Sequence, residues 1–151
     1  MIKLTFVLMS LLFATLGARA DVLNIDNTEL ARLSASGVAV IDIRTAPEWK
    51  ETGIVPGSHL FTLFDDKGRA DAPSWLDKVK SVAKPEQPVI LICRSGNRTR
   101  TAAQFLSQQA GYRTVYNVTK GIQAWAKDGR PMAQAANTAN AKVACTPNAS
   151  C

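Results

Sequence analysis

The sequence predicts an α/β fold in which an open parallel sheet is flanked by helices on both faces. Short apolar segments of strand length alternate along the chain with segments that carry apolar residues at helical spacing. Strands and helices that alternate in this way favour parallel pairing of the strands. No internal repeat is visible, and 151 residues are enough for one domain with a proper core but too few for two ordinary ones.

Five segments have the length and composition of strands. Val89–Cys93 contains no charged and no small polar residue, which suits a strand that is buried on both faces and covered by helices on each side. His59–Leu63 follows the turn-rich residues 53–58 and is expected near an edge of the sheet. The other three strands are expected at Val22–Ile25, Val38–Ile43 and Thr114–Val118.

Five helical segments are expected between these strands, several with a clear start or stop signal. Asp26 or Asn27 can cap the first helix, and Pro47 suits the first turn of the second. Pro73 or Ser74 starts the third, whereas Gly111 ends the fourth. The expected helices run over residues 27–35, 47–52, 74–83, 98–110 and 122–127.

The two ends of the chain differ from the domain of residues 21–131. Residues 1–20 contain one lysine, an apolar run from Leu4 to Leu16 and an Ala-Arg-Ala ending, the pattern of a secretory signal peptide. The run is shorter than the roughly 20 residues that a membrane-spanning helix needs. We therefore expect cleavage after Ala20, export across the inner membrane to the periplasm, and no membrane attachment afterwards. Residues 132–151 are low in complexity and are expected to form a flexible tail.

The charge distribution argues against a nucleic-acid-binding protein. The formal net charge is +6, and loss of Lys3 and Arg19 with the signal peptide would lower it by two. The basic residues are scattered and form no stripe with interleaved aromatics, which nucleic-acid binding would favour. Three arginines, Arg94, Arg98 and Arg100, are concentrated near one cysteine, and this local group fits a small anionic substrate.

That cysteine, Cys93, lies where the buried central strand is followed by a short loop and a helix. Loop amides and a helix N-terminus attract anions and can lower the pKa of a thiol. Asp42 and Arg44 follow another apolar strand, and parallel strands place their carboxyl ends at one edge of the sheet, where ligands bind. The sequence therefore predicts a reactive thiolate at Cys93, with a carboxylate and a guanidinium at the same edge.

Three stretches carry a family resemblance. They are Val40-Ile-Asp42-Ile-Arg44-x-x-x-Glu48-Trp49 followed by Gly53-Ile-Val-Pro56-Gly57-Ser58, then Cys93-Arg94-Ser95-Gly96-Asn97-Arg98-Thr99, and finally Gly121-Ile-Gln-Ala-Trp125-x-x-x-Gly129-x-Pro131. In this order and spacing they resemble the signatures of single-domain rhodaneses, which are sulfurtransferases. The resemblance extends from about Val22 to Pro131.

The resemblance implies an enzyme that needs neither a cofactor nor a metal. Cys93 would be the catalytic nucleophile that takes a sulfane sulfur from a small anionic donor such as thiosulfate and passes it to cyanide or to a thiol, including a protein thiol. Asp42 and Arg44 would support the site. The substrate-binding residues would be those of the loop after the cysteine: Arg94, Ser95, Gly96, Asn97 and Arg98.

The identity of the donor and three alternative functions remain open. Two-domain thiosulfate sulfurtransferases have cationic residues where Glu48 and Ser95 stand here, which leaves the identity of the donor open. A sulfur carrier without efficient turnover would need the same cysteine. A phosphatase of the Cdc25 type would need arginine where Thr99 stands, since here the arginine follows Cys93 after only four residues. A thiol-protease dyad would depend on His59, the only histidine.

The remaining two cysteines, Cys145 and Cys151, lie in the tail. In an exported protein they can form a small disulfide loop, which is the favoured interpretation. The alternative is that one of them accepts sulfur from Cys93 or shields it in a mixed disulfide.

Overall fold

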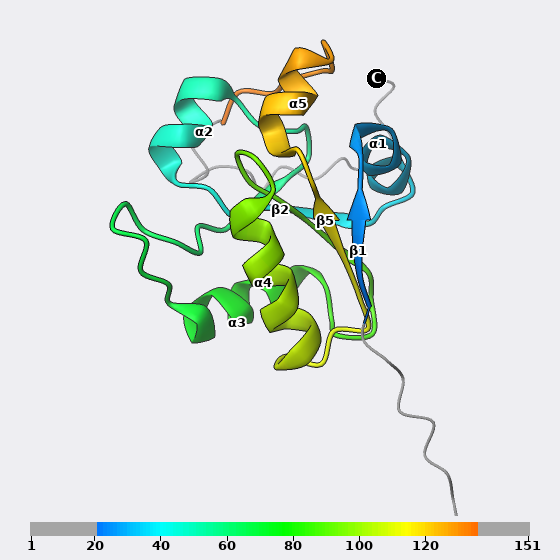
Figure 1. Cartoon of the computed structure of the whole chain (residues 1–151), viewed down its shortest axis with the longest axis vertical. Coiled ribbons are helices and arrows are strands. Elements are labelled where there is room, and N and C mark those ends of the chain that lie inside the picture. The colour runs from blue at the N-terminus through cyan, green and yellow to red at the C-terminus, as the bar shows by residue number, and fades with distance from the viewer. Residues whose placement is uncertain (1–20, 136–151) are drawn as a thin grey trace, which may run out of the picture.

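The computed structural model describes residues 21–135, which form one five-stranded parallel sheet with five helices (Figure 1). The strand order β1-β5-β4-β2-β3 places β4 in the centre and β3 at an edge. The predicted fold class is therefore confirmed. The strands are β1 Asp21–Ile25, β2 Ala39–Asp42, β3 His59–Leu60, β4 Val89–Ile92 and β5 Thr114–Val118.

The first and third helices begin after aspartates whose carboxylates accept hydrogen bonds from free amides of the first turn. The Asp26 carboxylate accepts hydrogen bonds from the amides of Thr28 and Glu29, both at 2.9 Å. Asp71 caps the third helix, which begins at Ala72, one residue before Pro73 and two before Ser74, the two predicted starts. The helices are α1 Asn27–Ala35, α2 Ala46–Thr52, α3 Ala72–Val82, α4 Asn97–Gln108 and α5 Gly121–Lys127.

Helices cover both faces of the sheet, and the alternation of side chains along β4 shows how. Val89, Leu91 and Cys93 face a cluster that includes side chains of α3 and α4, whereas Ile90 and Ile92 face a cluster that includes side chains of α1 and α5. The four residues of β4 and the following Cys93 are each at most 1% exposed. A strand buried on both faces is what its uninterrupted apolar sequence predicted.

The edge strand is shorter than expected. Only His59 and Leu60 pair with β2 as a regular strand, although the amides of Phe61 and Leu63 still donate to the carbonyls of Asp42 and Ile43, at 3.1 and 3.2 Å. The chain therefore follows β2 beyond the strand proper but departs from regular pairing.

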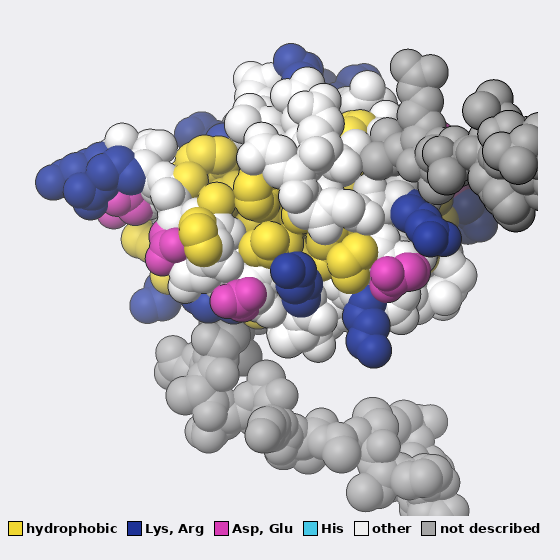
Figure 2. Space-filling view, turned by 90° about the horizontal axis from the view of Figure 1, so that it is seen from below, with side chains coloured by type: hydrophobic (Ala, Val, Ile, Leu, Met, Phe, Trp, Pro, Cys, Tyr) yellow, Lys and Arg dark blue, Asp and Glu magenta, His cyan; other side chains and the backbone are white. Residues whose placement is uncertain are grey.

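Hydrophobic side chains gather on the face toward the carboxyl end of α4, with charged side chains around them (Figure 2). A hollow of about 310 Å³ on this side lies between α4 and the segment before α3, and its apolar lining includes Leu63, Phe64 and Phe105. Within residues 21–135, no helix combines the length and the apolar character that crossing a membrane requires. The expected signal peptide and nearly all of the expected tail, residues 136–151, lie outside the described residues.

Candidate active site

Cys93 stands at the carboxyl end of β4, and the N-terminus of α5 holds the peptide groups that follow it. The amide of Ile122 donates to the carbonyl of Cys93 at 2.8 Å, and the amide of Gln123 donates to the carbonyl of Arg94 at 3.3 Å. In a trans peptide the C=O and the next N–H point in opposite directions. The amides of Arg94 and Ser95 therefore point away from α5.

Two glycines allow this loop and α5 to approach each other closely. Gly96 has φ +90°, and a Cβ atom there would collide with the backbone of Thr119, just after β5. Gly121 has φ +57°, and a Cβ atom there would collide with the carbonyl oxygens of Cys93 and Arg94. Both positions combine a left-handed backbone with close packing, so only glycine fits without displacing the loop.

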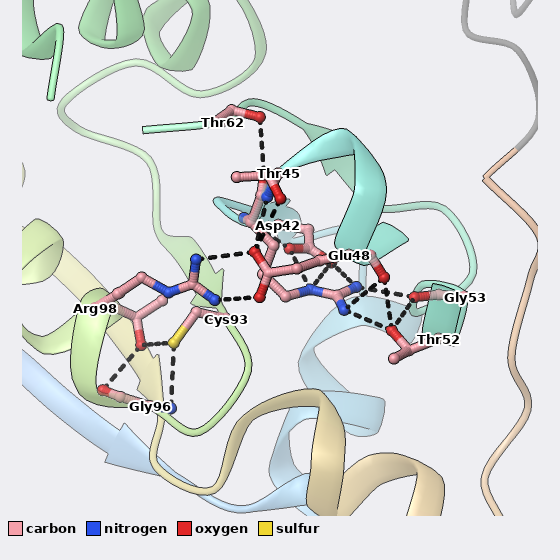
Figure 3. A network of polar contacts seen from close by, with 11 residues as sticks. Asp42, Thr45, Glu48, Thr52, Gly53, Thr62, Cys93, Gly96 and Arg98 are labelled. Atoms are coloured by element: carbon pink, nitrogen blue, oxygen red, sulfur yellow. Dashed lines mark hydrogen bonds and ion pairs between the residues drawn. The ribbon is translucent and has the colours of Figure 1, made fainter. Parts of the chain in front are cut away.

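The sulfur of Cys93 is held by polar groups although the side chain is 1% exposed. The amide of Gly96 donates to Sγ at 3.2 Å, and the Thr99 hydroxyl lies 3.5 Å from Sγ while also reaching the Gly96 carbonyl at 3.1 Å (Figure 3). Because a hydroxyl carries one proton, it can donate to the carbonyl beside a neutral thiol and turn to the sulfur beside a thiolate. The buried position thus retains a polar cradle for the sulfur.

This cradle controls the ionisation of the thiol. Burial raises the pKa of Cys93, but hydrogen bonds from the Thr99 hydroxyl and from the amides of Thr99, Ser95 and Gly96 outweigh burial. The net pKa of Cys93 therefore lies below its usual value. The thiolate, which is the nucleophilic form, is therefore favoured at Cys93.

Replacing Thr99 by Val should raise the pKa of Cys93 and slow alkylation of this thiol in acidic solution. Because a hydrogen bond to a charged group is worth about 1.5 kcal/mol, we expect the alkylation rate of Cys93 to fall about tenfold at pH 6 and less at pH 9, where the thiol ionises anyway. The pH dependence of thiolate absorbance near 240 nm measures the pKa directly. Thr101→Val, on the exposed side of the same helix, is the matched control, and equal pH profiles for both variants would contradict this role.

Arg98 lies beside Cys93 and forms an ion pair with Glu48 (Figure 3). Its Nη1 and Nη2 atoms donate to the two carboxylate oxygens of Glu48 at 2.9 and 2.6 Å. Hydrogen bonding to Glu48 is the main reason that the pKa of Arg98 is raised, and the Cys93 sulfur adds to it. Glu48 is not a simple solvated helix residue, because its carboxylate also accepts a hydrogen bond from the Thr45 amide at 3.0 Å and its side chain is only 24% exposed.

Glu48→Gln should reduce the loss of stability in acid. Hydrogen bonding to Arg98 is the largest cause that lowers the pKa of Glu48 to about 2, from an ordinary value of 4.5. A lowered carboxyl pKa gives stability that is present above pH 4.5 and is lost as the pH falls through about 2. Allowing for solvent screening, we expect the variant to lose about 1 kcal/mol less between pH 5 and pH 2.

Urea unfolding at pH 5, 3.5 and 2 measures this difference. Glu86→Gln, at an exposed position, is the matched control. Parallel acid profiles for wild type and Glu48→Gln would contradict a stabilising ion pair with Arg98.

Asp42 and Arg44 form a buried ion pair that does not contact the sulfur directly. Arg44 donates from Nε and Nη2 to the Asp42 carboxylate at 2.9 and 2.6 Å, and the two side chains are 1% and 0% exposed. The guanidinium also donates to the Thr52 hydroxyl at 2.7 Å and to the Gly53 carbonyl at 2.8 Å. The pair therefore connects the end of β2 to the end of α2, the helix that carries Glu48.

The remaining residues of the predicted loop are more exposed. Arg94, Ser95 and Asn97 are exposed, and Asn97 begins α4. Arg94 lines a hollow of about 130 Å³ between α2 and α5, together with Glu48 and Gln123. The loop thus combines a buried sulfur with a basic side chain at the surface.

His59 is not a partner of Cys93. Its ring stacks on Phe61 at a centroid distance of 5.8 Å, and β2 lies between its strand and β4. The described residues also contain no group of three or more His, Cys, Asp or Glu side chains that could hold a metal ion. The structure brings together Cys93, Gly96, Arg98 and Thr99, whereas His59 lies on the edge strand β3.

Sequence reasoning missed three features of the site. Thr99 was noted only because a phosphatase would need arginine at this position, yet its hydroxyl lies against the Cys93 sulfur. Glu48 could have been found from the capping-box spacing with Thr45, which the structure shows. The hydrogen bonds from the N-terminus of α5 to the loop after Cys93 had no local signal, because these segments are far apart in the sequence.

Comparisons with known proteins agree with this geometry. The family model described as "Rhodanese-like domain" matches residues 26–128. Among curated proteins of Arabidopsis thaliana, "Rhodanese-like domain-containing protein 17" is 32% identical over 115 residues, covering 74% of this chain and 72% of that protein. "Thiosulfate sulfurtransferase 18" is 28% identical over 115 residues, covering 74% and 84%.

A solved structure shows the same architecture. The crystal structure of a rhodanese-related protein from Thermoplasma volcanium matches with a TM-score of 0.57 and 26% identity, covering 74% of this chain and 98% of that one.

Proposed function

Because the chain belongs to the rhodanese-like domain family, we propose that it is a sulfurtransferase that carries a sulfane sulfur on Cys93. One observation supports this most strongly: the Cys93 sulfur lies at the carboxyl edge of the sheet and receives a hydrogen bond from the Gly96 amide, with the Thr99 hydroxyl beside it. Those groups can stabilise a thiolate before transfer and a persulfide after it.

The reaction proceeds in two covalent steps. The Cys93 thiolate attacks the outer sulfur of thiosulfate, the S–S bond breaks, and sulfite leaves with the bonding electron pair. The Cys93 persulfide then gives its outer sulfur to cyanide or to a thiolate, and the electron pair of the broken bond returns to Cys93. No cofactor takes part in either step.

Access to the sulfur requires a side chain to move, because Cys93 is 1% exposed. The Arg98–Glu48 ion pair lies beside it (Figure 3), and its two side chains are 31% and 24% exposed. An anionic donor can replace the Glu48 carboxylate as the partner of Arg98 at little net electrostatic cost. Arg94, at the surface of the same loop, adds attraction for the donor.

Thiosulfate is the first donor to test, since a curated relative is named a thiosulfate sulfurtransferase. The experiment measures thiocyanate formation from thiosulfate and cyanide, and phosphate release from p-nitrophenyl phosphate in parallel. We expect thiocyanate at a rate proportional to enzyme concentration, and no phosphate. Persulfide formation without turnover would instead indicate a sulfur carrier, and phosphate release without thiocyanate would contradict the proposal.

We also propose that residues 1–20 direct export to the periplasm, because their composition has the signal-peptide pattern. N-terminal sequencing of the protein recovered from a periplasmic fraction should begin at Asp21. An N-terminus at Met1 in the cytoplasmic fraction would contradict this.

A further inference from the structure

The hollow between α2 and α5 adjoins the candidate active site, at the end of the molecule where both helices lie (Figure 1). Arg94, one of its lining residues, directly follows Cys93. Glu48, another lining residue, holds the Arg98 guanidinium that lies beside the Cys93 sulfur (Figure 3). A substrate that opens the Arg98–Glu48 ion pair to reach Cys93 therefore does so at one wall of this hollow.

Three polar side chains in the wall of the hollow are not used by the fold. Arg94, Glu51 and Gln123 all line it and are exposed. Within residues 21–135, none of these three side chains has a hydrogen bond or an ion pair. The hollow therefore offers a ligand one guanidinium, one carboxylate and one amide.

The other two charged side chains of the hollow are already paired. The Glu48 carboxylate holds Arg98. Arg44, which is 1% exposed, donates to the buried Asp42 carboxylate and to groups at the end of α2. Among the described residues that line the hollow, the free charges are therefore one positive and one negative.

This pair of free charges favours a ligand that carries both signs. A ligand carboxylate can pair with Arg94, and an ammonium can pair with Glu51 while the Gln123 side-chain carbonyl accepts a hydrogen bond from it. A ligand with a carboxylate alone would meet the like charge of Glu51, and one with an ammonium alone would meet that of Arg94. Pockets for drug-sized ligands measure roughly 300–1,000 Å³. A hollow of about 130 Å³ therefore suits a molecule of amino-acid size.

We propose that the hollow between α2 and α5 is the acceptor subsite for a zwitterionic thiol of amino-acid size, whose carboxylate pairs with Arg94 and whose ammonium pairs with Glu51. This rests on the proposed function, because the thiol takes its sulfur from the Cys93 persulfide. It narrows the acceptor from thiols in general to α-amino-acid thiols, of which cysteine is the simplest probe.

The transfer step needs no other reactant. The acceptor thiol loses its proton to water, and the thiolate attacks the outer sulfur of the Cys93 persulfide. A new S–S bond forms between these two sulfur atoms while the bond to Sγ of Cys93 breaks, and its electron pair returns to Cys93. The sulfur leaves as the persulfide of the acceptor, and the Cys93 thiolate is regenerated.

Four acceptor thiols that differ in charge test this subsite on the full chain. Cysteine carries both charges, 3-mercaptopropionate lacks the ammonium, cysteamine lacks the carboxylate, and 2-mercaptoethanol lacks both. Sulfite release from thiosulfate, measured against thiol concentration, gives kcat/KM for each acceptor. Each value is divided by the rate constant of the same thiol with 2-hydroxyethyl disulfide at the same pH, which corrects for thiolate fraction and nucleophilicity. We expect cysteine to exceed each singly charged thiol about fivefold, and 2-mercaptoethanol at least about tenfold.

Glu51→Lys reverses the charge that the ammonium is proposed to contact. The normalised ratio of cysteine to 3-mercaptopropionate should fall from about five to below about one, with Glu51→Gln in between, because the lysine repels the ammonium and attracts the carboxylate. Glu86→Lys, at another exposed glutamate that does not line the hollow, is the matched control. It should keep the wild-type ratio.

The results separate this inference from the proposed function. Equal normalised rates for the four thiols, or the same ratio in Glu51→Lys and Glu86→Lys, would overturn the inference and leave the proposed function standing. Absence of sulfite with all four thiols and with cyanide would instead refute the proposed function.

Discussion

Cys93→Ser is expected to abolish sulfur transfer, lowering turnover of thiosulfate by at least about 10³-fold. A serine hydroxyl at this position does not ionise near neutral pH and does not form a stable bond to a sulfane sulfur. The Gly96 amide and the Thr99 hydroxyl that cradle the sulfur cannot compensate, because they stabilise a charge that the variant no longer develops.

The same substitution should leave the fold intact. The side chain at this position is 1% exposed, but the serine hydroxyl finds hydrogen-bond partners in the same two groups, so no buried polar atom is left unpaired. Turnover and thermal unfolding are measured on the same preparation, with Cys93→Ala as a second inactive variant. Retained activity in a folded Cys93→Ser protein would contradict the proposed mechanism.

Arg44→Met should produce the largest loss of stability, about 3–5 kcal/mol in the free energy of unfolding. The substitution removes the guanidinium from a carboxylate that is 0% exposed and leaves Asp42 buried without its partner. It also removes the hydrogen bonds to Thr52 and Gly53 that hold the end of α2. Since α2 carries Glu48, sulfur transfer should also fall.

A matched control lies in α1. Arg32 makes two hydrogen bonds to Glu29 at 2.8 and 2.6 Å, a similar geometry to that of Arg44, but its side chain is 64% exposed. Exposed ion pairs contribute little because water screens them and compensates their loss. Arg32→Met should therefore leave urea unfolding nearly unchanged, and similar losses in the two variants would contradict the role of burial.

The double variant Asp42→Asn/Arg44→Met adds a further check. It should be less destabilised than the sum of the two single variants, because the unpaired buried charge is gone. Additive losses would show that the two side chains do not act as a pair.

Much of the fold could be predicted because its signals are local. The uninterrupted apolar sequence of β4 indicated a strand covered on both faces, and in the structure this strand is fully buried. Asp26 indicated the start of α1 by the chemistry of its side chain. The edge strand was predicted three residues too long, because its pairing with β2 depends on where the chain leaves the sheet.

The site was only partly predictable because its main contacts join distant segments. Cys93 and its glycine-containing loop were visible in one stretch of sequence. Arg98 and Glu48 are fifty residues apart, and only the folded chain brings the guanidinium to the carboxylate. The requirement for glycine at position 121 likewise comes from the carbonyl oxygens of Cys93 and Arg94, which no local pattern reveals.

The intact mass of the protein after incubation with thiosulfate tests the central claim most directly. A persulfide on Cys93 adds one sulfur, about 32 Da, and peptide mapping should place it on Cys93. We predict that the added mass appears in the Cys145→Ser/Cys151→Ser variant, where only Cys93 can carry it, and disappears on addition of cyanide. An unchanged mass, or an added sulfur that cyanide does not remove, would contradict the account.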